Sequence, residues 1–128
     1  METDRGRHAT TIEPVVVRGS SMSPTFEEGD VLLIDRSRRR PRYGDVVAFT
    51  RGHGVIVHRS IGFRREMGDA LPRPRPLPPA EVVGVAVAHT RGTRTIALTG
   101  VRARSIGAVR ATRSLIRAVR SRIHHRTR

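Results

Sequence analysis

Lysine and cysteine are absent from this sequence of 128 residues, and aromatic residues make up only 3% of it. Without cysteine, the chain has no disulfide bond, no thiol nucleophile and no thiolate ligand for a metal ion. Without lysine, a serine nucleophile that needs a basic partner must take it from the histidines. The low aromatic content predicts an aliphatic core and leaves few side chains on which nucleic-acid bases could stack.

Acidic residues are also few. Eleven Asp and Glu stand against 25 basic residues, all of them arginine, so the formal net charge is +14. Such a surface attracts nucleic acid, acidic lipid or acidic peptide, although a general compositional bias toward arginine explains the charge about as well. No run approaches the roughly 18 apolar residues of a membrane span, and the polar N-terminus lacks the apolar core of a secretory signal. We therefore expect a cytoplasmic or peripheral membrane location, without a transmembrane segment or signal peptide.

Short β-branched runs between Gly and Pro turns predict a mainly β fold. Strands are expected at residues 13–18, 31–35, 46–49, 55–61, 81–88 and 94–98. Five prolines within residues 62–80 predict a long extended loop through which no regular element runs. We expect a flexible arm over residues 1–11, a β domain that contains this loop over residues 12–101, and a basic helix with its tail over residues 102–128.

An amphipathic helix is predicted over about residues 105–124, because four apolar residues recur there at helical spacing: Val109, Ile116, Val119 and Ile123. An adjacent stripe is basic and consists of Arg110, Arg113, Arg117 and Arg120. The apolar stripe can pack on the β domain, the commoner arrangement, while the arginines face solvent. Alternatively it lies at a lipid boundary with the arginines on anionic head groups, or in the groove of a partner protein.

Ser21 is a candidate nucleophile, because it lies between Gly19 and Pro24 at a turn that follows a predicted strand. A serine hydroxyl is a weak nucleophile and needs a base. Of the six histidines, His58 is the best placed, because it follows Val55–Val57 in a strand that would hold the imidazole still and partly desolvate it. A structural histidine is about as common at such a position.

Five segments in order resemble the conserved boxes of type I signal peptidases. They are Val17–Thr25 with Gly29-Asp30, Gly44–Phe49, Val57–Gly62, Gly68–Ala70 and Val82–Gly84. Bacterial members usually carry lysine at the position of His58, whereas members of the endoplasmic-reticulum and archaeal type carry histidine. The chain therefore resembles the Ser/His variant within the signal peptidase and LexA-like superfamily of serine peptidases.

The resemblance implies a coiled antiparallel sheet, partly open and barrel-like, with the C-terminal amphipathic helix beside it. It also implies a serine endopeptidase that cleaves a signal or leader peptide from a precursor protein through an acyl-enzyme, with no metal ion or cofactor. Ser21 would be the nucleophile, His58 the general base and Asp69 the residue that holds the imidazole. Other carboxylates that remain as alternatives for this last role are Asp30, Asp35 and Asp45.

Substrate or oxyanion binding is assigned to residues beside the nucleophile, namely Ser20, Met22 and Pro24. Many family members carry serine where this chain has Gly19, and the Ser20 side chain should point elsewhere in an extended backbone. The backbone N–H of Ser21 is therefore expected to be the main oxyanion donor.

Two other functions need consideration. A LexA-like regulator that cleaves itself would need a DNA-binding domain and an internal Ala-Gly site, but no helix-turn-helix pattern precedes Val15 and no Ala-Gly dipeptide occurs. A non-enzymatic module that binds nucleic acid needs only the charge, but Tyr43 and three Phe are the only aromatic residues. It would also leave the ordered boxes unexplained, so a nucleic-acid partner is not expected.

Overall fold

The computed structural model describes residues 11–62, 64–71, 73–99 and 101–126, with the helix side chains described from 105 to 122. The predicted arm lies outside the described residues apart from Thr11. In order, the elements are β1 Ile12–Val16, β2 Val31–Asp35, β3 Val46–Arg51, β4 Gly54–Ser60, β5 Arg65–Met67, β6 Arg75–Pro76, the 3-10 turn η1 Pro79–Glu81, β7 Val82–Arg91, β8 Arg94–Ala97 and α2 Val101–Arg126.

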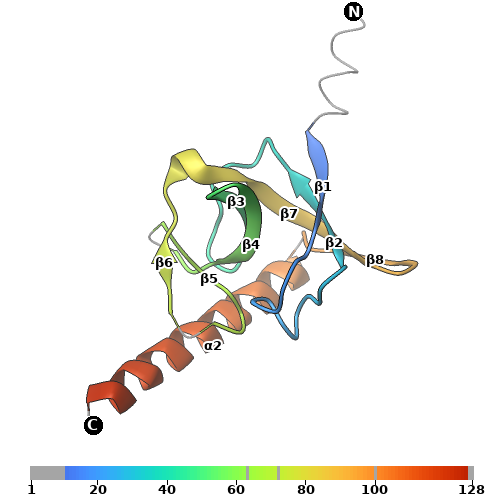
Figure 1. Ribbon diagram of the computed structural model, residues 1–128. Helices are drawn as coiled ribbons and strands as arrows, with labels where there is room; N and C mark the ends of the chain where they lie inside the picture. Colours follow the sequence, from blue (N-terminus) through green and yellow to red (C-terminus); the bar gives the residue numbers. More distant parts are fainter. Residues whose placement is uncertain (1–10, 63, 72, 100, 127–128) are drawn as a thin grey trace, which may run out of the picture.

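The strands form one coiled sheet in the order β1-β2-β7-β3-β4-β5-β6, and β8 pairs with β7. Every pairing is antiparallel. The path does not close between β1 and β6, and the sheet curls above α2, which passes beneath it (Figure 1). The predicted mainly β, partly open antiparallel fold with a C-terminal helix is confirmed.

The core follows from the alternation of side chains along the strands. In β2, Leu32 and Ile34 are fully buried while their neighbours in the strand are partly exposed. In β3, all four residues of Val46–Phe49 are buried, because this strand lies between β7 and β4 with apolar clusters on both of its faces. The β3–β4 hairpin therefore holds β4, whose last four residues are buried, against the core.

Short elements interrupt the segment 62–80, where the prolines led us to expect none. Arg65–Met67 precedes the prolines and pairs with β4, and Arg75–Pro76 pairs with β5. Pro76 is tolerated there because β6 ends the path of the sheet, and an edge strand does not need every N–H for pairing. The expectation of an uninterrupted loop is therefore wrong.

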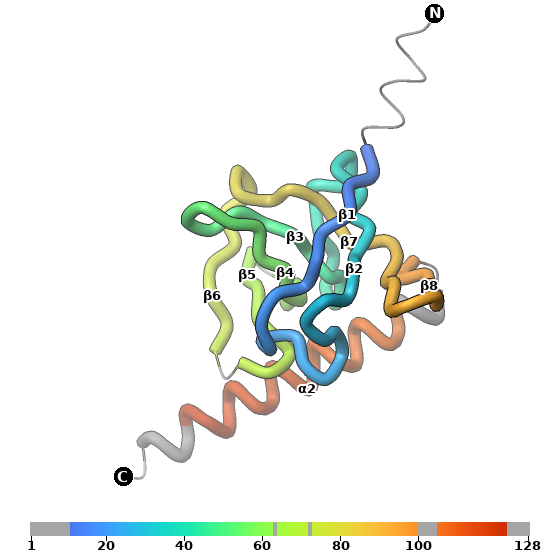
Figure 2. Tube along the Cα trace, turned by 45° about the vertical axis from the view of Figure 1, so that its right-hand side comes forward, coloured from blue at the N-terminus to red at the C-terminus, as the bar shows by residue number. Residues whose placement is uncertain are grey.

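The helix α2 packs against the domain through small residues, not through the predicted apolar stripe. Figure 2 shows it running beneath the strands, and its buried residues are Gly107, Ala111, Ser114 and Ala118. A Cβ atom on Gly107 would lie 2.5 Å from the Gly44 carbonyl oxygen, so the backbones approach too closely for large side chains between them.

The predicted apolar stripe instead faces away from the domain. Val109, Ile116 and Val119 are 52%, 49% and 56% exposed, and the side chain of Ile123 lies outside the described residues. Packing of this stripe on the β domain was therefore a wrong expectation. In the part of the chain that the structure describes, no helix combines the length and the apolar character that a membrane crossing requires.

Candidate active site

Ser21 lies in the loop that connects β1 to β2, and this loop is fixed at both ends. The N–H of Val17 donates to the Asp30 carbonyl at 2.8 Å, and the N–H of Gly29 donates to the Val17 carbonyl at 2.9 Å. Met22 and Phe26 are buried in the core on the same loop. Two apolar anchors thus hold the loop while Ser21 stays partly exposed.

His58, on β4, faces the nucleophile candidate directly. Its Nε2 lies 3.0 Å from Ser21 Oγ, within hydrogen-bond distance, and the side chain of His58 is largely buried. The Phe49 ring packs edge-on against the imidazole, with the ring centroids 5.7 Å apart. The structure therefore brings together the two residues that the sequence analysis assigned to the dyad.

Glu66, on β5, contacts the other ring nitrogen of His58. Glu66 Oε2 hydrogen-bonds His58 Nδ1, and Glu66 Oε1 accepts a hydrogen bond from Arg51 Nη1 at 2.9 Å. Glu66 is only 1% exposed, so its carboxylate is held in one orientation. Because an ionised carboxylate only accepts hydrogen bonds, Nδ1 must donate its proton, which leaves Nε2 of neutral His58 free to accept one from Ser21.

Asp69 does not hold the imidazole, so that assignment is corrected. Its carboxylate instead receives two hydrogen bonds of 2.8 Å from the Arg59 guanidinium and one of 2.6 Å from Thr25 Oγ1. Burial raises the pKa of Asp69, but the hydrogen bonds and charge of Arg59 outweigh it and hold this pKa below its usual value. Asp69 thus links Arg59, the residue after His58, to Thr25 in the loop that carries Ser21.

The segment around Asp69 also braces Ser21 through its backbone. The N–H of Ala70 donates to the Ser21 carbonyl at 2.8 Å, and the N–H of Asp69 donates to Met22 Sδ at 3.3 Å. A Cβ atom on Gly68 would lie 2.6 Å from the Ser21 carbonyl oxygen. Glycine is therefore required at this position if the two segments are to approach so closely.

The alternative carboxylates are engaged away from His58. Asp30 binds His89 and Arg91, and the hydrogen bond from Arg91 holds the pKa of Asp30 well below its usual range. Asp35 and Asp45 accept hydrogen bonds from the backbone N–H of Ser37 and Arg42, which stabilises the local turns.

The residues assigned to substrate or oxyanion binding do not line the cleft beside Ser21. Met22 is 1% exposed and belongs to the core. Ser20 and Pro24 are exposed, and the Ser20 carbonyl accepts the N–H of Ser23 within the turn. Among the described residues, no hydrogen bond uses the Ser21 N–H, so this donor stays available for an oxyanion.

Glu66 and Arg51 are the site residues that the sequence analysis missed. The register of β4 and β5 places Glu66 opposite Ser60, and Ser60 lies on the same face of β4 as His58. Glu66 is therefore a diagonal cross-strand neighbour of His58. The sequence could have indicated Glu66 only as a carboxylate that follows His58 after a turn. That inference required a strand to be predicted at residues 65–67 and paired with the strand of His58.

The cleft around these groups has a volume of about 310 Å³. Two apolar residues, Ile56 and Leu71, line it beside Ser21, His58 and Glu66. Its remaining lining residues are arginines: Arg18, Arg51, Arg73 and Arg75.

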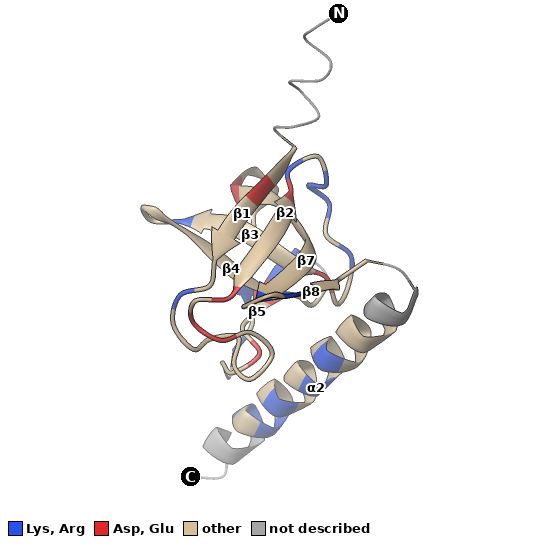
Figure 3. Ribbon diagram, turned by 90° about the vertical axis from the view of Figure 1, so that its right-hand side faces the viewer, with Lys and Arg blue, Asp and Glu red and all other residues tan. Residues whose placement is uncertain are grey.

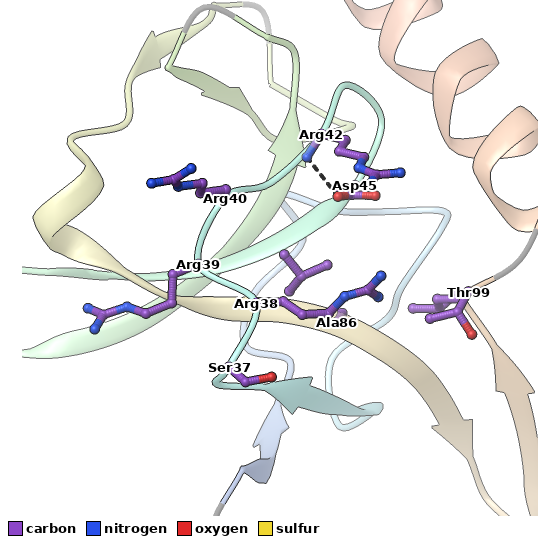
Figure 4. Close-up of a pocket in the computed structure, with 10 residues that line it drawn as sticks. Ser37, Arg38, Arg39, Arg40, Arg42, Asp45, Ala86 and Thr99 are labelled. Atoms are coloured by element: carbon purple, nitrogen blue, oxygen red, sulfur yellow. Dashed lines mark hydrogen bonds between the residues drawn. The ribbon is translucent and has the colours of Figure 1, made fainter.

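A second depression, of about 360 Å³, lies at the basic loop after β2. Figure 4 shows Arg39 and Arg40 extending to one side of this loop, while Arg38 and Arg42 extend to the other. These guanidinium groups diverge and face no nucleophile with a paired base. The depression therefore lacks the chemistry that the Ser21 cleft has.

Comparison with known proteins agrees with this site. Residues 7–67 match the family model described as Peptidase S24-like, a segment that contains Ser21, His58 and Glu66 and ends before Asp69. Neither the curated proteins nor the solved structures gave a match to the chain. The match covers a little under half of the sequence and does not distinguish signal peptidases from self-cleaving relatives. It supports similarity of this segment to the serine peptidases of the LexA and signal peptidase superfamily.

Proposed function

We propose that this protein is a serine endopeptidase that cleaves a signal or leader peptide from a precursor protein. The observation that carries the proposal is the chain of contacts from Ser21 Oγ to His58 Nε2, at 3.0 Å, and from His58 Nδ1 to Glu66. A nucleophile, a base in reach of it and a group that orients the base form the arrangement used for acyl transfer. The resemblance to signal-peptidase boxes supports the finer assignment of the substrate.

In the first step, Ser21 Oγ attacks the scissile carbonyl carbon while His58 Nε2 takes the hydroxyl proton. The carboxylate of Glu66 stabilises the imidazolium that forms, and the backbone N–H of Ser21 donates to the developing oxyanion. His58 then protonates the leaving amine, the C–N bond breaks, and an acyl-enzyme remains. Water, deprotonated by His58, attacks the ester and releases the acid, and Ser21 regains its proton.

The test compares Ser21→Ala with Ser20→Ala, because the two serines are adjacent and Ser20 does not line the cleft. We expect a serine-reactive fluorophosphonate probe to label the wild type and Ser20→Ala but not Ser21→Ala. Co-expression with candidate precursors, followed by mass spectrometry of their N-termini, should show cleavage that depends on Ser21. Wild-type cleavage by Ser21→Ala would show that Ser21 is not the nucleophile.

A self-cleaving regulator is the second candidate, because the Peptidase S24-like match is compatible with it as well as with a signal peptidase. Against it stands the lack of an Ala-Gly dipeptide in the sequence. Self-cleavage would shorten the chain at a rate independent of protein concentration, whereas a peptidase acting on another chain cleaves added precursor at a rate proportional to enzyme concentration. A non-enzymatic nucleic-acid module would instead show steeply salt-dependent DNA binding and no probe labelling.

We propose in addition that the outward face of α2 contacts anionic membranes. Val109, Ile116 and Val119 are exposed on it, and Arg113 and Arg120 are exposed beside them. Arginines recur along the helix, separated by residues that carry no charge (Figure 3). An apolar stripe flanked by arginine suits a lipid boundary with negative head groups.

The other two arginines of the predicted basic stripe are turned toward the domain. Burial and the nearby charge of Arg59 lower the pKa of Arg110, and Arg117 donates to the Leu71 carbonyl at 2.6 Å. Sedimentation with phosphatidylglycerol vesicles, but not phosphatidylcholine vesicles, tests the membrane contact. Ile116→Glu should abolish it, whereas Ile12→Glu, a matched exposed isoleucine on β1, should not.

A further inference from the structure

The catalytic cleft is lined by charges of predominantly one sign. Arg18, Arg51, Arg73 and Arg75 contribute four guanidinium groups, and Glu66 contributes one carboxylate. With His58 neutral, the lining therefore has a formal charge of +3. A cleft lined mostly by one sign of charge attracts anionic groups to the position of the proposed nucleophile.

Three of these arginines have no counter-ion among the residues that the structure describes. Arg51 is engaged, since it donates to Glu66 and to the Pro76 carbonyl and lies over the Phe49 ring. The carboxylate of Glu66 is in turn occupied by Arg51 and His58.

The guanidinium groups of the other three arginines form no hydrogen bond or ion pair with any residue that the structure describes. These exposed residues are Arg18, Arg73 and Arg75. Their charges are available to a bound molecule.

This arrangement differs from that of several other arginines. Arg59 and Arg91, which lie outside the cleft, are paired with Asp69 and Asp30, and the arginines of the loop after β2 point in diverging directions (Figure 4). In the cleft, Arg18 comes from the loop that carries Ser21, whereas Arg73 precedes β6 and Arg75 is the first residue of β6. Two segments distant in sequence thus bring unpaired arginines to the same cleft as Ser21.

We infer that the cleft selects peptides with aspartate or glutamate residues close to the scissile bond. This inference rests on the proposed peptidase function and names the class of substrate. Ile56 and Leu71 supply an apolar surface for the side chain next to the scissile bond. Arg18, Arg73 and Arg75 supply the charges that recognise acidic residues flanking it, and such complementarity contributes chiefly to specificity and to the rate of association.

The experiment uses two internally quenched peptides that share a small-residue cleavage site and differ only in flanking Asp residues replaced by Asn. The ratio of kcat/KM for the two peptides is measured for the wild type, for Arg75→Gln and for Arg73→Gln with Arg75→Gln. Arg94→Gln in β8 is the matched control, because it removes the same charge from an exposed residue outside the cleft. All replaced side chains are exposed, so the variants should fold.

We expect the wild type to prefer the Asp peptide, with each exposed ion pair contributing up to roughly fivefold. The preference should decrease stepwise in the two cleft variants and with added salt, and remain at the wild-type value in Arg94→Gln. Equal kcat/KM for the two peptides, or a preference that the double variant retains, would overturn the inference.

A parallel measurement separates this inference from the proposed function. Anisotropy of the same peptides on Ser21→Ala reports binding without cleavage, and probe labelling of the wild type reports the nucleophile. Labelling of Ser21 without any discrimination between the peptides overturns the inference alone. Discrimination that depends on Arg73 and Arg75, but without labelling or cleavage, supports acidic-peptide binding and overturns the peptidase function.

Discussion

Replacement of Glu66 by glutamine tests the proposed catalytic arrangement most sharply, because the change keeps the shape of a buried side chain and alters only its charge and its hydrogen bonding. Arg51 Nη1 donates to one carboxylate oxygen, and His58 Nδ1 contacts the other. Arg51 can only donate, so the amide of Glu66→Gln must turn its oxygen toward Arg51 and its NH₂ toward His58. Nδ1 then has to accept, the ring proton moves to Nε2, and His58 cannot accept the proton of Ser21.

The size of the effect follows from the lost charge and the wrong tautomer. A carboxylate and an imidazolium about 4 Å apart attract each other by roughly 4 kcal/mol at the effective dielectric constant of a protein site. Each 1.4 kcal/mol or so corresponds to tenfold in rate, so loss of this attraction alone lowers kcat by about 10³. The corresponding Asp-to-Asn change in Ser-His-Asp hydrolases lowers kcat by about 10⁴. We expect a loss of about 10³ to 10⁴ for Glu66→Gln.

The assay measures kcat on a cleaved precursor peptide together with the melting temperature, which should stay close to that of the wild type. Arg51→Met combined with Glu66→Gln is the decisive control. The Arg51→Met replacement removes the guanidinium that donates to residue 66, but its aliphatic side chain can still pack over the Phe49 ring. The amide oxygen is then free to face Nδ1, and activity should recover by on the order of tenfold over Glu66→Gln alone. Wild-type activity in Glu66→Gln, or a double variant no more active than the single one, would refute the reasoning.

Three further predictions concern the scaffold of the site. Asp69→Asn leaves the buried Arg59 charge without its partner and should lower the free energy of unfolding by about 3–5 kcal/mol, measured by urea denaturation; a loss under 1 kcal/mol would contradict the buried pair. Gly68→Ala places a Cβ atom 2.6 Å from the Ser21 carbonyl and should lower probe labelling of Ser21 more than it lowers the melting temperature, whereas unchanged labelling would show that the loop yields freely. The pKa values of Asp30 and Asp69 are lower in the folded state than in the unfolded chain, so the unfolded state binds protons first and stability should fall below about pH 4. A melting temperature that stays constant from pH 5 to pH 2 would contradict this expected loss of stability at low pH.

Strands could be predicted from the sequence where a local hydrophobic pattern corresponds to the burial of the side chains in the sheet. The strand Val31–Asp35 was predicted with the bounds that the structure has, because its apolar residues are bracketed by Gly29-Asp30 and a basic loop. The short strand Arg65–Met67 was missed, because its three residues carry no pattern of their own. Its existence depends on pairing with β4, a tertiary contact that local propensity does not encode.

Dependence on strand pairing also explains which residue of the candidate site was missed. Ser21 and His58 lie in dense local motifs, whereas Glu66 reaches His58 only through the register between β4 and β5. Asp69 is preceded by a glycine in a recognisable box, but the sequence does not reveal that Arg59 binds both of its carboxylate oxygens. A carboxylate bound in this way is not available to an imidazole. The position of Asp69 in the Gly68–Ala70 box therefore led to the wrong third residue.

The helix is connected to the catalytic residues more closely than its position beneath the sheet suggests. Arg117 donates to the Leu71 carbonyl at 2.6 Å, and Leu71 lines the cleft. The same segment contains Gly68, which packs against the Ser21 carbonyl. One face of α2 therefore supports the segment that braces the nucleophile, while the opposite face, with Ile116, is exposed. A molecule that binds the outer face would therefore contact an element whose inner face helps to fix the position of Ser21, so the proposed membrane contact and the proposed catalytic site would depend on the same helix.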